Sequence, residues 1–125
     1  MDVKLLKGAS NVVDGHFSYC EADCFFVPVS EYMGSAQAIF YDIASIREIC
    51  RHIKSNKIQK PIVYILTCRI GPFIKKYVDQ IHKYGGKVFL NPDGHEWARR
   101  KWSKTVRKYW KISEQMMVKY ADHII

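Results

Sequence analysis

The chain has 125 residues, 48% of them hydrophobic, and its 20 lysines and arginines outweigh 12 aspartates and glutamates to give a net charge of +8. This length and apolar content predict one domain with a real core and exclude a disordered chain. The longest uncharged apolar runs, 24–29 and 62–68, are too short to span a bilayer, and residues 1–4 do not open a signal segment. We therefore expect a cytoplasmic protein that can lie at the inner face of the cell membrane.

The cysteines Cys20, Cys24, Cys50 and Cys68 include no CxxC pair, and no histidine stands at zinc-ligand spacing from them. Three of the four lie in apolar surroundings, where a buried free thiol is the common role of cysteine. A metal or disulfide role is the less favoured alternative, and we expect no cofactor.

The first third of the chain contains two expected strands and one expected helix. Residues 1–14 are polar and weakly patterned, 16–19 form a short strand, and the aromatic and β-branched run 24–29 forms a firmer one that Pro28 ends or marks as an edge. Ser35 is the expected N-cap of the helix that follows. Apolar residues recur in this helix at spacings of three and four: Ala36, Ile39, Phe40, Ile43, Ile46, Cys50 and Ile53.

Strands and helices then alternate. Residues 62–67 are nearly all apolar, which predicts a central parallel strand covered on both faces. The loop 68–72 leads to a helix expected over 73–84, which the glycines at 85–86 end in a left-handed conformation. A strand is expected over 87–90.

A long amphipathic helix is expected from Ala98 to about Tyr120, and 121–125 has the pattern of a further strand. This order of elements predicts an α/β domain with a Rossmann-like parallel sheet, right-handed crossovers and helices on both faces. Both ends look cut relative to a complete unit. We therefore expect residues 1–125 to form a single domain truncated at both ends.

The loop after strand 87–90 concentrates reactive groups in the order Asn91-Pro92-Asp93-Gly94-His95-Glu96-Trp97. It follows the carboxyl end of a parallel strand, the edge at which open α/β sheets bind ligands. The proline and the Asp-Gly pair leave backbone groups unpaired, and the first N–H groups of the next helix face the same crevice. The loop therefore predicts a binding site.

Positive charge concentrates behind this loop. Seven cations and no acid occur between positions 98 and 111: Arg99, Arg100, Lys101, Lys104, Arg107, Lys108 and Lys111. With aromatic residues interleaved, such a run suits phosphate, RNA or anionic lipid, and a solvated helix face is the equal alternative. The aromatic residues fall at helical core spacing rather than on a strand platform, which disfavours RNA.

Several segments carry a resemblance to a known family. They are 34–42 (GSAQAIFYD), 64–73 (YILTCRIGPF), 85–88 (GGKV), 91–97 (NPDGHEW) with 99–102, and 107–122 (RKYWKISEQMMVKYAD). On these segments the chain resembles the N-terminal domain of bacterial family 4 glycosyltransferases of the rhamnosyltransferase type, which assemble capsules and other surface polysaccharides. Long matches in one order are more specific than any single motif.

The resemblance implies one lobe of a two-lobed B-type glycosyltransferase fold, which binds the acceptor while a C-terminal lobe beyond Ile125 binds the nucleotide sugar. It implies transfer of L-rhamnose from dTDP-rhamnose to a lipid-linked saccharide, without a required metal. The family's glycine-rich opening turn is absent before Met1, so we do not expect catalysis by these residues alone. A non-catalytic basic module for anionic lipid or RNA is the alternative. Another nucleotide-binding α/β enzyme is disfavoured because no phosphate-cradling glycine motif occurs.

Within that resemblance, His95 is the candidate catalytic residue, because an imidazole titrates near neutrality and can bond to an acceptor hydroxyl. Asp93, Gly94, Glu96 and Trp97 are candidates for binding the acceptor, with the indole stacking on a pyranose face. Structural roles stay open as alternatives: a core histidine or tryptophan, a helix cap at Asp93, and a dipole partner at Glu96.

Three further positions complete the candidate site. Arg69 follows the strand 62–67 and can reach a phosphate or carbohydrate, or equally form a structural salt bridge. Arg99, Arg100 and Lys101 suit the diphosphate of a lipid-linked acceptor or the anionic leaflet. Asp42 lies beside the apolar stripe of its helix, and we expect it to be a solvent-facing acid.

Overall fold

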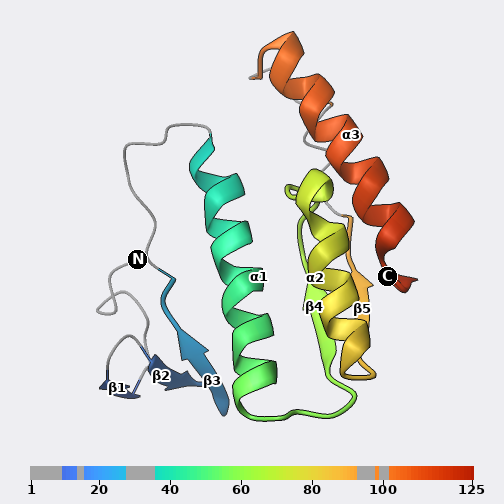
Figure 1. The fold of residues 1–125 in the computed structure, drawn as a ribbon. Coiled ribbons are helices and arrows are strands. Elements are labelled where there is room, and N and C mark those ends of the chain that lie inside the picture. The colour runs from blue at the N-terminus through green and yellow to red at the C-terminus, as the bar shows by residue number, and fades with distance from the viewer. Residues whose placement is uncertain (1–9, 14–15, 28–35, 93–97, 99–101) are drawn as a thin grey trace.

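The computed structural model describes residues 10–13, 16–27, 36–92, 98 and 102–125. In chain order its elements are β1 (Ser10–Val13), β2 (His16–Tyr19), β3 (Ala22–Phe25), α1 (Gln37–Ser55), β4 (Ile62–Ile65), α2 (Gly71–Lys83), β5 (Lys87–Leu90), α3 (Lys104–Tyr120) and β6 (His123–Ile124). Figure 1 shows α2 in front of β4 and β5, with α1 and α3 on either side of it. The fold is a mixed α/β structure with a parallel sheet of Rossmann-like type, as the sequence predicts.

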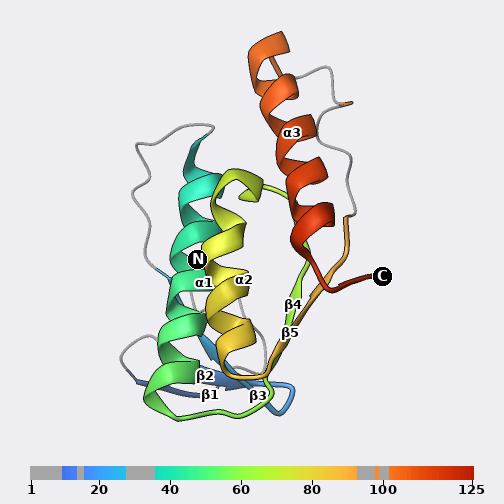
Figure 2. The same cartoon turned by 45° about the vertical axis from the view of Figure 1, so that its right-hand side comes forward.

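The parallel sheet has the strand order β4-β5-β6. Its register places Val63 beside Val88 and Ile65 beside Leu90. Because both crossovers advance in the same direction and are right-handed, α2 and α3 must lie on the same face of the sheet. Figure 2, in which the sheet lies to one side of the helices, is consistent with this arrangement.

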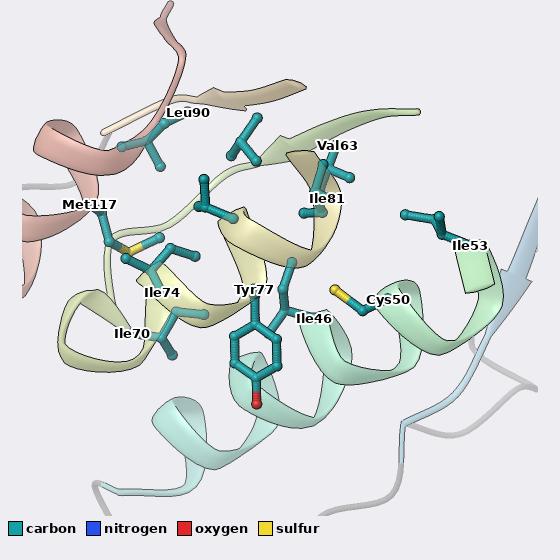
Figure 3. Close-up of a cluster of buried hydrophobic side chains, with 12 residues drawn as sticks. Ile46, Cys50, Ile53, Val63, Ile70, Ile74, Tyr77, Ile81, Leu90 and Met117 are labelled. Atoms are coloured by element: carbon teal, nitrogen blue, oxygen red, sulfur yellow. The ribbon is translucent and has the colours of Figure 1, made fainter. Parts of the chain in front are cut away.

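The core lies between this face and the helices. Val63 and Leu90 project from the strands into a cluster that includes Ile46 of α1, Ile74 of α2 and Met117 of α3 (Figure 3). All three helices therefore cover the same side of the sheet. Helix α2 occupies the middle position, because it packs against both α1 and α3.

The opposite side of β4 is open among the residues that the structure describes. Ile62 is 73% exposed, Tyr64 49% and Leu66 60%. The prediction of a central strand covered on both faces is thus wrong for β4, which lies at the edge of the sheet that the described residues form. Helices were expected on both faces of the sheet, and the described helices cover one face. A continuous apolar run shows that both sides of a strand are apolar, but it does not show what covers them.

The strands before α1 form a separate antiparallel sheet rather than joining the parallel one. Cys20 and Glu21 adopt positive φ angles of 49° and 65° between β2 and β3. A two-residue turn of this kind matches the twist of an antiparallel hairpin. The strand expected over 24–29 is therefore shifted, to Ala22–Phe25, and β1 within the weakly patterned residues 1–14 was not predicted.

Two predicted helix starts are wrong. The N-cap of α1 is Ala36, which makes no side-chain cap hydrogen bond, rather than Ser35, which lies outside the described residues. Helix α3 begins at Lys104 rather than Ala98, because Ser103 caps it by accepting a hydrogen bond from the Val106 N–H at 3.3 Å. The cap and dipole alternatives for Asp93 and Glu96 therefore do not apply to α3.

Helices α2 and α3 approach most closely at Gly71 and Ser113. A Cβ atom on Gly71 would lie 2.2 Å from the Ser113 carbonyl oxygen and 2.6 Å from its Cα. The Ser113 hydroxyl accepts a hydrogen bond from the Gly71 N–H at 2.7 Å and donates one to the Cys68 carbonyl at 2.6 Å. A buried serine on α3 thus caps the first turn of α2 and fixes the loop before it.

We predict that Gly71→Ala destabilises the fold. The added methyl would meet backbone atoms, which cannot move aside as a side chain can, so α2 and α3 would have to separate. Overpacking of this kind costs about 1–3 kcal/mol of the free energy of unfolding, or more. Urea denaturation measures the loss, with Thr105→Ala on the exposed surface of α3 as the control. An unchanged transition midpoint in Gly71→Ala would contradict the close packing described above.

Candidate functional site

The carboxyl ends of β4 and β5 and the amino ends of α1, α2 and α3 lie at the same end of the domain (Figure 1). Open parallel sheets bind ligands at this edge, because strand ends and helix N-termini leave backbone groups unpaired there. The loop that follows β4 and leads to α2 lies at this edge, and it includes the polar residues Thr67 and Arg69.

Asp42 of α1 contacts both polar residues of this loop. Its Oδ2 accepts a hydrogen bond from the Thr67 hydroxyl at 2.8 Å, and the Arg69 guanidinium lies 3.8 Å from the same oxygen. The Asp42 side chain is only 16% exposed. The expectation of a solvent-facing acid is therefore wrong: Asp42 faces the loop after β4. Its position at the border of the apolar stripe of α1 was the available signal.

The environment of Asp42 disfavours its charged form. Burial raises the pKa of this carboxyl, while the hydrogen bond from Thr67 and the charge of Arg69 lower it by less. The pKa of Asp42 is therefore above its ordinary value. Ionisation of Asp42 is thus incompletely compensated, and carboxyl groups with a pKa shifted by burial cluster at functional sites.

A cavity of about 230 Å³ adjoins this carboxylate, between α1 and β4. Tyr41, Asp42 and Ser45 of α1 line one wall. The lining is completed by side chains of α1, of β4 and of the loop after it: Ile46, Ile49, Tyr64, Ile65, Leu66, Thr67 and Ile70. Most of this wall is apolar, and its polar groups gather near Asp42.

Helix α3 fixes the loop that carries Arg69. The Tyr109 hydroxyl donates a hydrogen bond to the Arg69 carbonyl at 2.7 Å, next to the contact between Ser113 and Cys68. The Arg69 side chain is 32% exposed and contacts Asp42 through one nitrogen. The salt-bridge alternative for Arg69 is therefore present, and its predicted contact with an acceptor stays a prediction.

The other predicted site residues lie outside the described part of the chain. They are Asp93, Gly94, His95, Glu96, Trp97, Arg99, Arg100 and Lys101. The described chain reaches them from Asn91, whose N–H donates to the Ile65 carbonyl at 2.9 Å. Asn91 therefore lies at the carboxyl edge of the sheet, as the sequence predicts for the start of this loop.

The exposed lysines of α3 and its buried aromatic residue lie on different sides of the helix. Trp110 is buried and packs edge to face with Trp102, at 5.8 Å between ring centroids, and with Tyr109, at 5.2 Å. Exposed lysines at spacings of three, four and eight follow one side of the helix: Lys104, Lys108, Lys111 and Lys119. The described aromatic residues thus stabilise the helix packing, while the lysines face solvent.

Comparison with known proteins gives one result. A family model described as a domain of unknown function (DUF1972) matches residues 4–125. This domain occurs in proteins associated with glycosyltransferases. Neither the curated proteins nor the solved structures contain a significant match. Across the residues with a described structure, no helix is long and apolar enough to cross a membrane, and no three metal-binding side chains converge.

We predict a pH-dependent stability effect for Asp42→Asn. Because the folded-state pKa of Asp42 is raised above 3.8, its contribution to folding is complete below that pH and is lost as pH rises through the raised pKa. The variant lacks this titration. Its stability relative to wild type should therefore increase from acid to neutral pH, measured by urea denaturation, with Asp79→Asn as the exposed control. A pH-independent difference would show that the Asp42 charge is fully compensated.

We predict a defined order of cysteine alkylation. Burial and the charge of Glu114 raise the pKa of Cys68 to about 11, so few of its thiols are ionised at neutral pH. Burial also raises the pKa of Cys50, whereas Cys20 is exposed. Iodoacetamide followed by peptide mass spectrometry should label Cys20 first. Labelling of Cys68 ahead of Cys20 in the folded protein would contradict this structure.

Proposed function

Because the chain belongs to the DUF1972 family, we propose that it is the acceptor-binding domain of a glycosyltransferase. The observation that carries this proposal is the pair of Asp42 and Thr67 in the wall of a cavity at the carboxyl edge of a parallel sheet, with Arg69 beside Asp42. A few polar groups, here hydroxyl and carboxylate, beside an apolar wall are the combination that binds a polar ligand with a hydrophobic face. The association of the domain with glycosyltransferases supports the same assignment.

In its specific form, the proposed reaction transfers L-rhamnose from dTDP-rhamnose to a lipid-linked saccharide for a surface polysaccharide. The support is the sequence resemblance over 34–42, 64–73 and 91–97. In this proposal His95 bonds to the attacking acceptor hydroxyl, and Asp93, Gly94, Glu96 and Trp97 hold the saccharide. A separate lobe binds the nucleotide sugar, so this domain supplies position rather than the whole reaction.

A lipid-linked acceptor places the domain at the cytoplasmic face of the membrane. The exposed lysines of α3 support this part of the proposal, since each cation near an anionic leaflet adds about 1 kcal/mol of attraction. Arg99, Arg100 and Lys101 precede α3 in the chain and would add to the same contact or meet the acceptor diphosphate. We propose peripheral binding at this surface.

The alternative function is a non-catalytic basic module for anionic lipid or RNA. The lysines of α3 favour it, because they would bind any polyanion. The burial of Trp110 argues against single-stranded RNA, which proteins hold by stacking bases on exposed aromatic rings. Nucleic acid is therefore not the partner that we propose.

We predict saccharide-dependent membrane binding. Liposomes of phosphatidylglycerol and phosphatidylcholine should retain the chain, and inclusion of undecaprenyl-diphosphate-linked N-acetylglucosamine should increase retention severalfold. His95→Gln should keep the basal retention and lose the increase, because the lysines of α3 are unchanged. Co-sedimentation measures both quantities.

The same assay separates the two functions. If retention is the same with and without the saccharide, and single-stranded RNA displaces the protein from the liposomes, the basic module is favoured and the acceptor-binding role is overturned. Retention that needs the saccharide and resists RNA would support it. His52→Gln, which changes an exposed histidine on α1, is the matched control for the loss of an imidazole.

A further inference from the structure

We propose that the cavity between α1 and β4 binds one neutral sugar ring of the acceptor, with Asp42 receiving hydrogen bonds from its hydroxyl groups. This inference rests on the proposed function and assigns the ligand to a place that the sequence did not indicate. It concerns Asp42, Ser45, Thr67 and the two tyrosines at the cavity mouth, Tyr41 and Tyr64.

The Asp42 carboxylate has one oxygen engaged and one available. Both described contacts, from the Thr67 hydroxyl and the Arg69 guanidinium, reach Oδ2. Within the part of the chain that the structure describes, Oδ1 has no such contact. A carboxylate oxygen accepts hydrogen bonds strongly, and a ligand hydroxyl that donates to Oδ1 would help to compensate the buried charge of Asp42.

Two of the hydroxyls that line the cavity, those of Ser45 and Thr67, already donate their protons within the protein. Thr67 donates to Asp42, and Ser45 donates to the Tyr41 carbonyl at 2.8 Å. Each hydroxyl oxygen keeps lone pairs and can accept a hydrogen bond. Beside Asp42 the polar groups are therefore mainly acceptors, while the hydroxyls of Tyr41 and Tyr64 can donate as well as accept. A saccharide, whose O–H groups do both in a small space, matches this combination.

The Asp42 carboxylate disfavours an anionic occupant. Phosphate and carboxylate groups are mainly acceptors, and here they would face Asp42 at the cavity wall, where like charges repel. Arg69, the cation beside Asp42, is not among the residues that line the cavity, and its described contact is with Asp42 itself. The cavity therefore suits the sugar of a lipid-linked acceptor and not its diphosphate.

The walls and the size of the cavity fit one ring. Tyr41 is 43% exposed and, with Tyr64, offers an aromatic surface for the C–H face of a pyranose. Ile46, Ile49 and Ile65 form an apolar floor. At about 230 Å³ the cavity is below the roughly 300–1,000 Å³ of sites for drug-sized ligands, a size that suits one sugar ring better than a whole nucleotide sugar.

Amide chemical-shift perturbation tests the inference on the intact chain. Methyl α-L-rhamnoside and N-acetylglucosamine are titrated separately, with inorganic phosphate as the anionic probe. We expect either sugar to shift the amides of Ser45, Ile46 and Thr67, and phosphate to leave them unchanged. Asp42→Asn should weaken sugar binding about tenfold or more, because a hydrogen bond to a charged acceptor is lost.

Two further variants keep the result interpretable. Thr67→Val removes the hydroxyl that orients Asp42 at nearly constant volume and should weaken sugar binding, whereas Asp79→Asn should leave it unchanged. Because the stability of Asp42→Asn relative to wild type is expected to be higher at neutral than at acid pH, binding is compared at neutral pH, where unfolding of the variant is least expected. A melting temperature for each variant, measured in the same buffer, checks this point.

The outcomes distinguish this inference from the function on which it rests. If a sugar binds but shifts only amides beyond Leu90, or if Asp42→Asn binds as wild type does, the cavity assignment is wrong and the acceptor-binding role stands. If phosphate shifts the cavity amides as the sugars do, the neutral-ligand assignment is overturned. If no sugar binds and the liposome assay shows no saccharide dependence, the proposed function itself fails.

Discussion

The contact between Gly71 and Ser113 is the constraint on which the site depends. Glycine lets α3 approach α2 closely enough for one buried hydroxyl to bond to both Gly71 and Cys68. Because Cys68 and Gly71 flank Arg69, the loop after β4 has little freedom, and the Tyr109 hydroxyl removes more of it. The loop in turn presents Arg69 to Asp42. The position of a carboxylate on α1 is thus related to the packing of α3 through three successive contacts.

The environment of Asp42 differs from the contact between α2 and α3 in how completely its polar groups are compensated. Where α2 and α3 meet, the buried hydroxyl satisfies partners on both sides, as stable interiors require. At Asp42 the protein buries a charge beside a cavity and compensates it only in part. Replacing a buried ion pair by apolar residues is often neutral or stabilising, so stability alone does not account for a carboxylate at this position. A ligand that donates hydrogen bonds, as proposed above, would compensate it.

Local patterns predicted the elements, and long-range contacts decided what the patterns left open. The strand 87–90, the glycine stop after α2 and the parallel order of the last strands follow from periodicity and turn chemistry. The edge position of β4 does not, since an apolar run reads alike in the centre and at the edge of a sheet. Asp42 and Thr67 are 25 positions apart, and no local pattern pairs them. The sequence therefore placed its candidate site at the sheet edge where the cavity lies, but it did not indicate that Asp42 faces this edge.

Strand β4 forms both the open edge of the sheet and one wall of the cavity, so pairing at this edge would affect the cavity wall. Lys87 and Asn91 donate to the carbonyls of Pro61 and Ile65, which means that odd-numbered residues of this strand pair with β5. Even-numbered residues such as Tyr64 therefore direct their backbone groups to the other edge, which is unpaired among the described residues. Tyr64 also lines the cavity. Any strand that paired with this edge would set the position of the Tyr64 ring, and so would reshape the wall opposite Asp42.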